Sequence, residues 1–225
     1  MASRIGKVPT AGACVCTPNA LPVRLRPTAL SGVSMSLTDF LVPSQAQMLR
    51  ALSTWIDKAA AHALARGTEQ DAFLSLRLAP DMYPLASQVR FACFLAQEAV
   101  FRLRGEPLPE QLEEVRREGW NAGERPGSLT DARARVTDAL SFLSDIQPGA
   151  LDDAADRPVA LELPNGMAFD MTGTRYVRDW SLPQFYFHVV ATCAILRNHG
   201  VELGKADLVP HMFAYLRPGS MPSQG

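Results

Sequence analysis

Residues 180–200 read WSLPQFYFHVVATCAILRNHG and form the most apolar stretch of the chain. Apolar side chains fall on nearly every side of a helix built from this stretch, and Gly200 is a natural stop. Such a helix is typically buried, and a polar residue inside it must be hydrogen-bonded or functional. His188 lies in its middle. We therefore expect this stretch to be the central helix of the fold, with His188 as the first candidate functional residue.

The composition is that of an ordinary globular domain. The chain has 225 residues, of which 47% are apolar and 20% are charged, which is enough for one domain with a substantial core. A formal net charge of -1 does not favour nucleic acid or an anionic membrane surface. Every apolar run is shorter than the ~20 residues of a spanning helix. We expect no nucleic-acid partner and no membrane segment.

The four cysteines form no disulfide or metal pattern. Cys93 and Cys193 lie within apolar helical patterns, where a thiol packs as a small hydrophobic group. Cys14 and Cys16 lack the spacing of a CxxC pair and have no histidine nearby. This cysteine usage predicts a reducing compartment, the cytoplasm.

Composition divides the chain into three parts. Residues 1–34 contain several prolines and basic residues, and no acidic residue occurs before Asp39. We expect a disordered or non-native N-terminal extension there, the alternative being an organelle-targeting segment. Residues 35–208 form the expected helical domain. Residues 209–225 are rich in Pro, Gly and Ser and are expected to be a flexible tail.

Apolar residues at three- and four-residue spacing predict three helices before the opening stretch. The second helix has Asp81 as its expected N-cap, and the third begins with a capping box, Ser128 to Asp131. The polar residues 108–127, which contain several glycines, are expected to form an exposed connection with at most one short helical piece. The three expected helices are residues 44–66, 81–104 and 129–146.

A change of period follows the third helix. Apolar residues alternate from Val159 to Leu163 and again from Met167 to Met171, separated by Pro164-Asn165-Gly166. Alternation on both sides of Asn-Gly is the strongest short-range signal for a β-hairpin. The sequence therefore predicts an all-α protein, a four-helix bundle with a β-hairpin inserted before the last helix.

The last helix also predicts self-association. In a four-helix bundle no helix is enclosed on every side, yet residues 180–200 are apolar nearly all round. The surplus apolar face suggests a homodimer.

Three blocks of sequence resemble those of a known family. They are RLAPDMYPLASQV (Arg77–Val89), LPQFYFH (Leu182–His188) and ILRNHGVELGKAD (Ile195–Asp207). The blocks resemble those of an uncharacterised bacterial family placed with the DinB/YfiT-like proteins, and the resemblance spans residues 36–208. It implies a DinB-like four-helix bundle, commonly dimeric. It also implies that some relatives hold a divalent metal with three histidines and catalyse thiol-dependent transferase or isomerase reactions.

The metal site of those relatives does not carry over to this sequence. Metal-binding relatives resemble H-x-x-x-H on the last helix, whereas here Thr192 follows His188 at that spacing. His199 shares the face of His188 but lies about 16 Å further along a helix. The second helix offers the amide Gln88 and no histidine. We predict no metal or other cofactor. His188 is the only candidate ligand, and a zinc, nickel or iron ion shared with Asp81 or another carboxylate is left open.

The candidate ligand pocket lies around His188. Imidazole titrates near neutral pH, so a pocket histidine serves as an acid–base group or a ligand contact. The alternative is a buried histidine that hydrogen-bonds a neighbouring helix and fixes the register of the bundle. We expect the pocket to contain His188, Tyr83, Gln88, Trp180 and Tyr186.

These patterns favour a small-molecule-binding bundle that lacks the full three-histidine metal site. The first alternative is a divalent-metal-dependent transferase or isomerase-like enzyme. The second is a structural, dimeric interaction protein. The sequence identifies no catalytic residue and does not decide whether the protein is an enzyme.

Overall fold

The computed structural model describes residues 36–163 and 165–220. The chain divides into two units, and all the described residues belong to the second, residues 35–225. The expected N-terminal extension, with Cys14 and Cys16, lies outside the described residues.

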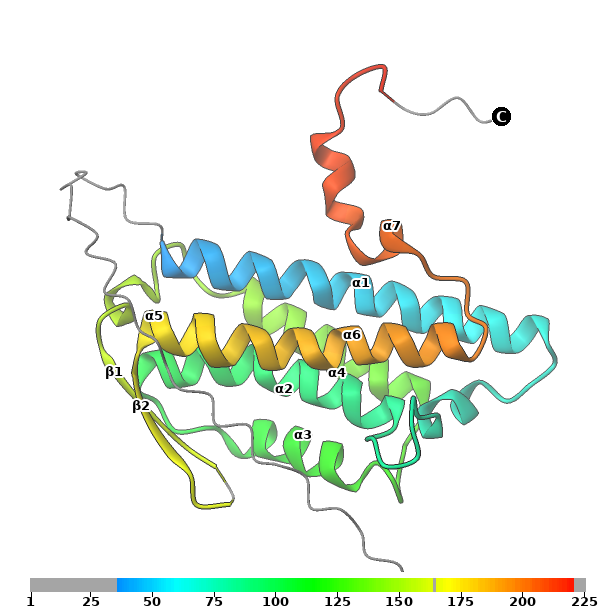
Figure 1. Cartoon of the computed structure of the whole chain (residues 1–225), viewed down its shortest axis with the longest axis horizontal. Helices are drawn as coiled ribbons and strands as arrows, with labels where there is room; N and C mark the ends of the chain where they lie inside the picture. The colour runs from blue at the N-terminus through cyan, green and yellow to red at the C-terminus, as the bar shows by residue number, and fades with distance from the viewer. Residues whose placement is uncertain (1–35, 164, 221–225) are drawn as a thin grey trace, which may run out of the picture. The chain divides into compact units, whose positions relative to one another are not determined.

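The second unit is a bundle of long helices (Figure 1). Helix α2 packs against both α4 and α6, and α1 packs against the other faces of these two helices. The core between them is filled by large, fully buried side chains that include Trp55, Phe185 and Leu103. The predicted four-helix bundle is confirmed. Its helices are α1 (Leu37–Ala65), α2 (Leu85–Arg104), α4 (Leu129–Ser144) and α6 (Leu182–Asn198).

Helix α1 begins earlier than residue 44, where the apolar pattern placed its start. The hydroxyl of Ser36 caps it by accepting a hydrogen bond from the amide of Asp39 at 3.0 Å. The carboxylate of Asp152 accepts bonds from the amide and hydroxyl of Thr38 at 3.0 and 2.8 Å. This contact joins segments that are far apart in the sequence. The helix also includes Pro43.

Helix α2 begins at Leu85, not at Asp81. Its N-cap is Pro84, which makes no side-chain capping bond, and Asp81 lies in the turn that precedes it. The expected capping box of α4 is confirmed, because Ser128 and Asp131 each accept a bond from the other's amide, at 3.1 and 2.8 Å.

The expected connection at residues 108–127 is a full helix, α3 (Glu110–Asn121). Leu112, Val115 and Gly119 share a buried face of α3, which packs on α2. A Cβ atom at Gly119 would lie 2.5 Å from Cε1 of Phe91. Glycine therefore lets α3 approach α2 closely, and the two helices form one wall of the site described below.

The predicted hairpin is confirmed. Strands β1 (Pro158–Glu162) and β2 (Ala168–Thr172) are antiparallel, with Leu161 opposite Phe169. Val159 and Leu161 are buried while their neighbours on β1 are exposed. Because side chains alternate between the two faces of a strand, Val159 and Leu161 lie on the same face of β1, and this face packs against the bundle.

The chain enters α6 through two short helical pieces. Helix α5 (Gly173–Tyr176) is followed by a π-helical turn, η3 (Val177–Ser181), which joins α6 directly. Trp180 lies in this turn, with its ring 6.3 Å from that of Phe169 on the hairpin. The expected last helix is thus preceded by a turn of a type that is common at functional sites.

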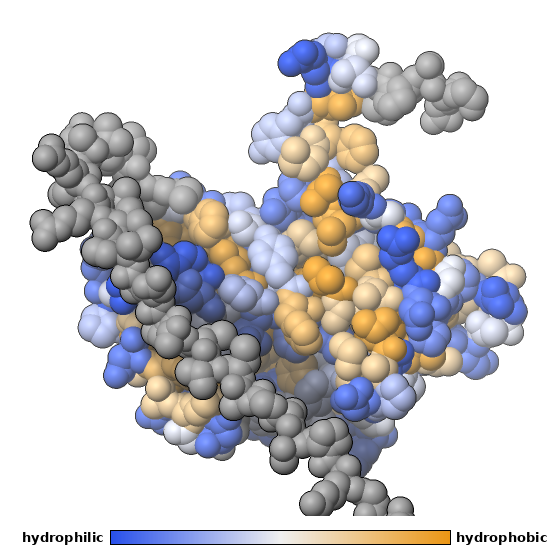
Figure 2. Space-filling view, viewed as in Figure 1, coloured by the Kyte–Doolittle hydropathy of each residue, from blue (hydrophilic) through white to orange (hydrophobic). Residues whose placement is uncertain are grey.

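The remaining elements are short. The expected tail, residues 209–225, contains a 3₁₀ helix whose large side chains are mostly exposed, and Figure 2 shows apolar residues along it. Within residues 36–163 and 165–220, no helix combines the length and apolar composition that crossing a membrane requires. The short elements are η1 (Gln70–Ser75), η2 (Asp152–Ala154), α7 (Lys205–Leu208) and η4 (Pro210–Tyr215).

Candidate functional site

A cavity of about 470 Å³ lies between α2, α3, the hairpin and the beginning of α6. This volume is in the range of pockets that hold small organic ligands. Residues from four separate stretches of the chain, 83–102, 116–120, 161–163 and 180–188, line it, so it exists only in the folded bundle. Its walls are largely aromatic and include Phe91, Phe94, Trp120, Trp180 and Phe187.

The structure brings together four of the five residues expected at the pocket. His188, Tyr83 and Trp180 line the cavity. Gln88 is buried behind His188 and is hydrogen-bonded to it. Tyr186 does not line the cavity and packs edge-to-face on Phe185. Residues two apart on a helix point in widely different directions, so Tyr186 and His188 face different surroundings.

The side chain of Gln88 determines where His188 carries its proton. The Nε2 amide of Gln88 donates to the backbone carbonyl of Tyr83 at 3.1 Å. Its Oε1 atom therefore faces Nδ1 of His188, at 2.7 Å. Because an amide oxygen only accepts hydrogen bonds, Nδ1 must be the protonated nitrogen. The other ring nitrogen, Nε2, forms no hydrogen bond with any described residue and is left as an acceptor.

His188 is also held neutral. Phe91 and Phe187 lie beside the imidazole, with ring centroids 5.1 and 5.2 Å away. Burial lowers the pKa of His188 to about 4, because desolvation disfavours the charged form. At neutral pH this end of the cavity therefore presents an uncharged imidazole among aromatic rings.

The other end of the cavity is charged. Nε of Arg102 donates to Oε1 of Glu98 at 2.8 Å. Burial raises the pKa of Glu98, and the nearby guanidinium of Arg102 opposes that shift. The guanidinium of Arg116 lies 4.9 Å from the centroid of the Trp120 ring and forms an ion pair with Glu113. Glu98 and Arg116 are therefore each in an ion pair. Among the described residues, Nε of Arg116 is nevertheless buried without a hydrogen-bond partner, and Glu162, which also lines the cavity, forms no ion pair.

Sequence reasoning missed most of this charged end. One signal was present in the sequence: Phe91, Leu95, Glu98 and Arg102 recur at four- and three-residue spacing and share a face of α2. No such signal indicated Arg116, because its segment, residues 108–127, was expected to be an exposed connection.

The donor set around His188 does not fit a three-histidine metal site. Thr192 is fully buried, and its hydroxyl donates to the backbone carbonyl of His188 at 3.0 Å within α6. Nε2 of His199 lies 3.4 Å from the carbonyl oxygen of Arg77, and Asp81 does not line the cavity. In the described part of the chain, no three His, Cys, Asp or Glu side chains gather where they could hold a metal ion.

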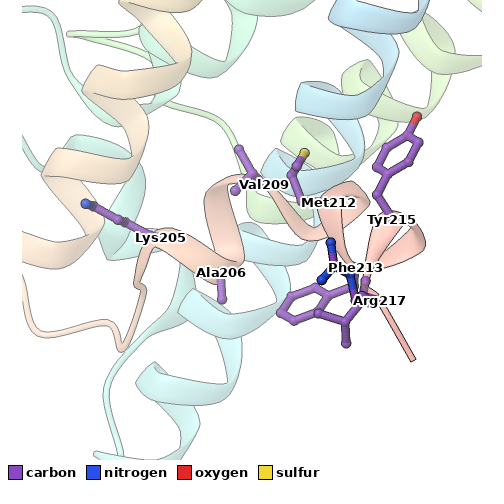
Figure 3. Close-up of a pocket in the computed structure, with 8 residues that line it drawn as sticks. Lys205, Ala206, Val209, Met212, Phe213, Tyr215 and Arg217 are labelled. Atoms are coloured by element: carbon purple, nitrogen blue, oxygen red, sulfur yellow. The ribbon is translucent and has the colours of Figure 1, made fainter. Parts of the chain in front are cut away.

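A second hollow, of about 400 Å³, lies in the C-terminal segment (Figure 3). It is lined only by residues of α7, η4 and the positions next to them, including Lys205, Val209, Met212 and Phe213. Because one short segment supplies its whole lining, this hollow brings together no side chains from other parts of the fold. The cavity beside His188 is therefore the candidate site.

The bundle and its inserted hairpin define a DinB-like protein. The crystal structure of a DinB family member protein from Shewanella denitrificans, at 1.83 Å resolution, has a TM-score of 0.63 to this structure and 28% sequence identity. The similarity covers 84% of this chain and 95% of that one.

Residues 37–209 match the family described as "Domain of unknown function (DUF1993)", and the chain belongs to this family. The predicted resemblance to an uncharacterised DinB-like branch is confirmed. No curated protein gives a match.

Proposed function

We propose that this protein binds a small, largely apolar molecule in the cavity beside His188. The observation that carries the proposal is the hydrogen-bonding of His188. Gln88 engages one ring nitrogen at 2.7 Å, while the other has no partner among the described residues of a cavity with aromatic walls. Convergent polar groups in an apolar pocket are typical of ligand sites.

A purely structural role for His188 accounts for only half of this geometry. The bond between Gln88 and His188 joins α2 to α6 and stabilises the bundle. A histidine that served only this purpose would gain nothing from lining a cavity. Leaving an acceptor unpaired in an apolar wall costs free energy unless water or a ligand satisfies it.

The metal-dependent transferase is the less favoured alternative. It requires further neutral donors near His188, and the residue one turn along α6, Thr192, directs its hydroxyl to the helix backbone. Threonine is also a poor ligand for zinc, which takes Cys, His and carboxylates.

Binding is tested by ligand-observed NMR with a set of neutral, anionic and cationic aromatic fragments. Gln184 lines the cavity, so Gln184→Trp should fill it and abolish the signal of fragments that bind the wild type. Gln111 is an exposed glutamine on α3 outside the cavity, and Gln111→Trp is the matched control that should keep binding. Absence of any bound fragment, or equal binding to Gln184→Trp, contradicts the proposal.

We also propose that the chain forms a homodimer through the outward face of α6. Phe187 and Val190 are 57% and 52% exposed. With Pro183 and Ala194 they follow the alternating four- and three-residue spacing of helix–helix contacts. In sedimentation equilibrium, Val190→Arg should give a single-chain mass, whereas Leu64→Arg, at another exposed apolar position on α1, should not. A single-chain mass for the wild type contradicts this proposal.

We also propose that the protein is cytoplasmic. Burial raises the pKa of Cys93 to about 12 and raises the pKa of Cys193 as well. Both are free thiols in the described structure. Unpaired, unreactive thiols support a reducing compartment.

A further inference from the structure

We propose that the ligand of this cavity is an uncharged aromatic molecule whose O–H or N–H group donates a hydrogen bond to Nε2 of His188. This inference rests on the proposed binding function and specifies the chemistry of what is bound. Three features of the site carry it: the fixed proton position of His188, the rings beside it, and the place of the Glu98–Arg102 pair further along α2.

The first feature makes Nε2 an acceptor only. If the amide of Gln88 were flipped, its oxygen would face the carbonyl oxygen of Tyr83, and the 3.1 Å bond between them would be lost. An unmade bond between buried polar groups is costly, and Gln88 is almost fully buried. The amide orientation is therefore fixed, Nδ1 keeps the proton, and Nε2 offers a lone pair. A ligand group at Nε2 must bring its own hydrogen.

The second feature favours an aromatic ring next to that donor. The rings of Phe91 and Phe187 flank the imidazole at 5.1 and 5.2 Å. The ring of Tyr83 meets Phe91 edge-on at 5.2 Å. Aromatic side chains in such arrangements interact best with another ring, stacked or edge-to-face. A phenol, an indole or a related heterocycle matches both the rings and the acceptor.

The third feature disfavours a charged ligand group at this end. On α2, Glu98 and Arg102 lie seven and eleven residues beyond Phe91, about 10 and 16 Å along the helix. The Glu98 carboxylate is already bound by Arg102 at 2.8 Å. An anion placed at Nε2 would face a lone pair, and a cation there would lose its water beside a neutral imidazole and aromatic rings.

The test uses four probes that share one ring: 4-methylphenol, 4-methylanisole, 4-methylbenzoate and 4-methylbenzylamine. Affinities are measured on the full chain by NMR titration at neutral pH. We expect 4-methylphenol to bind about fivefold more tightly than its methyl ether, as one net hydrogen bond implies, and the two charged probes to bind more weakly than 4-methylphenol.

Equal affinity for the phenol and the ether overturns this inference, as does tighter binding of the benzoate or the amine, and in either case the cavity still binds ligands. If none of the four probes and none of the fragment set binds, the proposed binding function itself fails. The two failures are therefore distinguishable.

A variant of Gln88 tests whether the fixed proton position of His188 causes the preference for the phenol. Gln88→Met keeps the length of the side chain but removes the acceptor at Nδ1, so the proton is free to move to Nε2. We expect ¹⁵N NMR of the imidazole to show that move, and the phenol to lose its advantage over the ether. Gln97→Met is the control, because Gln97 also donates to a backbone carbonyl from α2 but does not line the cavity.

An unchanged preference for the phenol in Gln88→Met overturns the inference. If this variant does not fold, the ¹⁵N spectrum of the His188 imidazole in the wild type is the deciding measurement. A proton on Nδ1 supports the inference, and a proton on Nε2 overturns it.

Discussion

The two ends of the cavity satisfy their polar groups in different ways. At one end, Glu98 binds Arg102 and Arg116 binds Glu113, so these four charges pair within the protein. At the other end, Gln88 satisfies one nitrogen of His188 and no described residue satisfies the second. At the charged end the Glu98 carboxylate is paired, while Nε of Arg116 is buried without a hydrogen-bond partner among the described residues. At the histidine end the open group is an acceptor, Nε2 of an uncharged ring. The comparison indicates that the histidine end accepts a hydrogen bond from an uncharged ligand group and that the Glu98–Arg102 pair supports the wall.

The largest expected effect comes from breaking the charged end. Arg102→Ala leaves the carboxylate of Glu98, which is 4% exposed, without its partner. Removing one member of a buried ion pair typically costs about 3–5 kcal/mol of unfolding free energy, and we expect the lower part of this range because Arg102 is partly exposed. Urea denaturation measures the loss.

Arg117→Ala is the matched control. Arg117 pairs with Glu110 and Glu114 on the exposed surface of α3, where ion pairs contribute little. A loss in Arg102→Ala no larger than that in Arg117→Ala would show that the charged end does not support the fold.

The next largest expected effect is a pH dependence of the unfolding free energy that comes from His188, at the histidine end. The pKa of His188 is lowered from 6.5 to about 4 in the folded protein, so the unfolded chain binds a proton first as the pH falls. The native state is therefore favoured above pH 6.5, and stability is lost as the pH falls from about 6.5 to about 4, by up to about 3 kcal/mol.

The measurement is the unfolding free energy of wild type and His188→Phe across that range. The variant lacks the titrating group and should lose less stability as the pH falls. Parallel curves for the two proteins would mean that His188 is not held neutral by the fold.

A smaller effect is expected from crowding the contact between α2 and α3, which form the wall shared by both ends of the cavity. Gly119→Ala places a methyl group against the ring of Phe91, 2.5 Å from Cε1. Crowding of this kind costs about 1–3 kcal/mol, and displacement of Phe91 should weaken ligand binding at the histidine end. Thermal unfolding and probe titration measure the two effects. Gly123→Ala, also beside α3 but in contact only with the flexible end of Arg77, should change neither.

Much of the fold could be predicted because its signals are local. The capping box at Ser128 and the Asn165-Gly166 turn each act over a few residues, and both elements form where expected. The start of α1 could not be predicted, since Asp152, far away in the sequence, binds Thr38 there. Helix α3 was missed because its stability depends on packing against α2, which a polar sequence does not reveal.

The candidate site was only partly predictable for the same reason. His188 is conspicuous as a polar residue within an apolar helix, and Gln88 as an amide near the start of another. Their contact, and the roles of Arg116 and Trp120, depend on how three helices and a hairpin meet. Tyr186 does not line the cavity, because proximity in sequence to His188 does not give it the same face of α6.

The most direct test of the central claim is the ¹⁵N spectrum of the His188 imidazole at neutral pH, recorded during titration with 4-methylphenol and, separately, with 4-methylanisole. The account predicts a neutral ring protonated on Nδ1, whose Nε2 resonance shifts on addition of the phenol and shifts far less with the ether. A ring protonated on Nε2, or an Nε2 resonance that responds equally to both probes, would contradict the account.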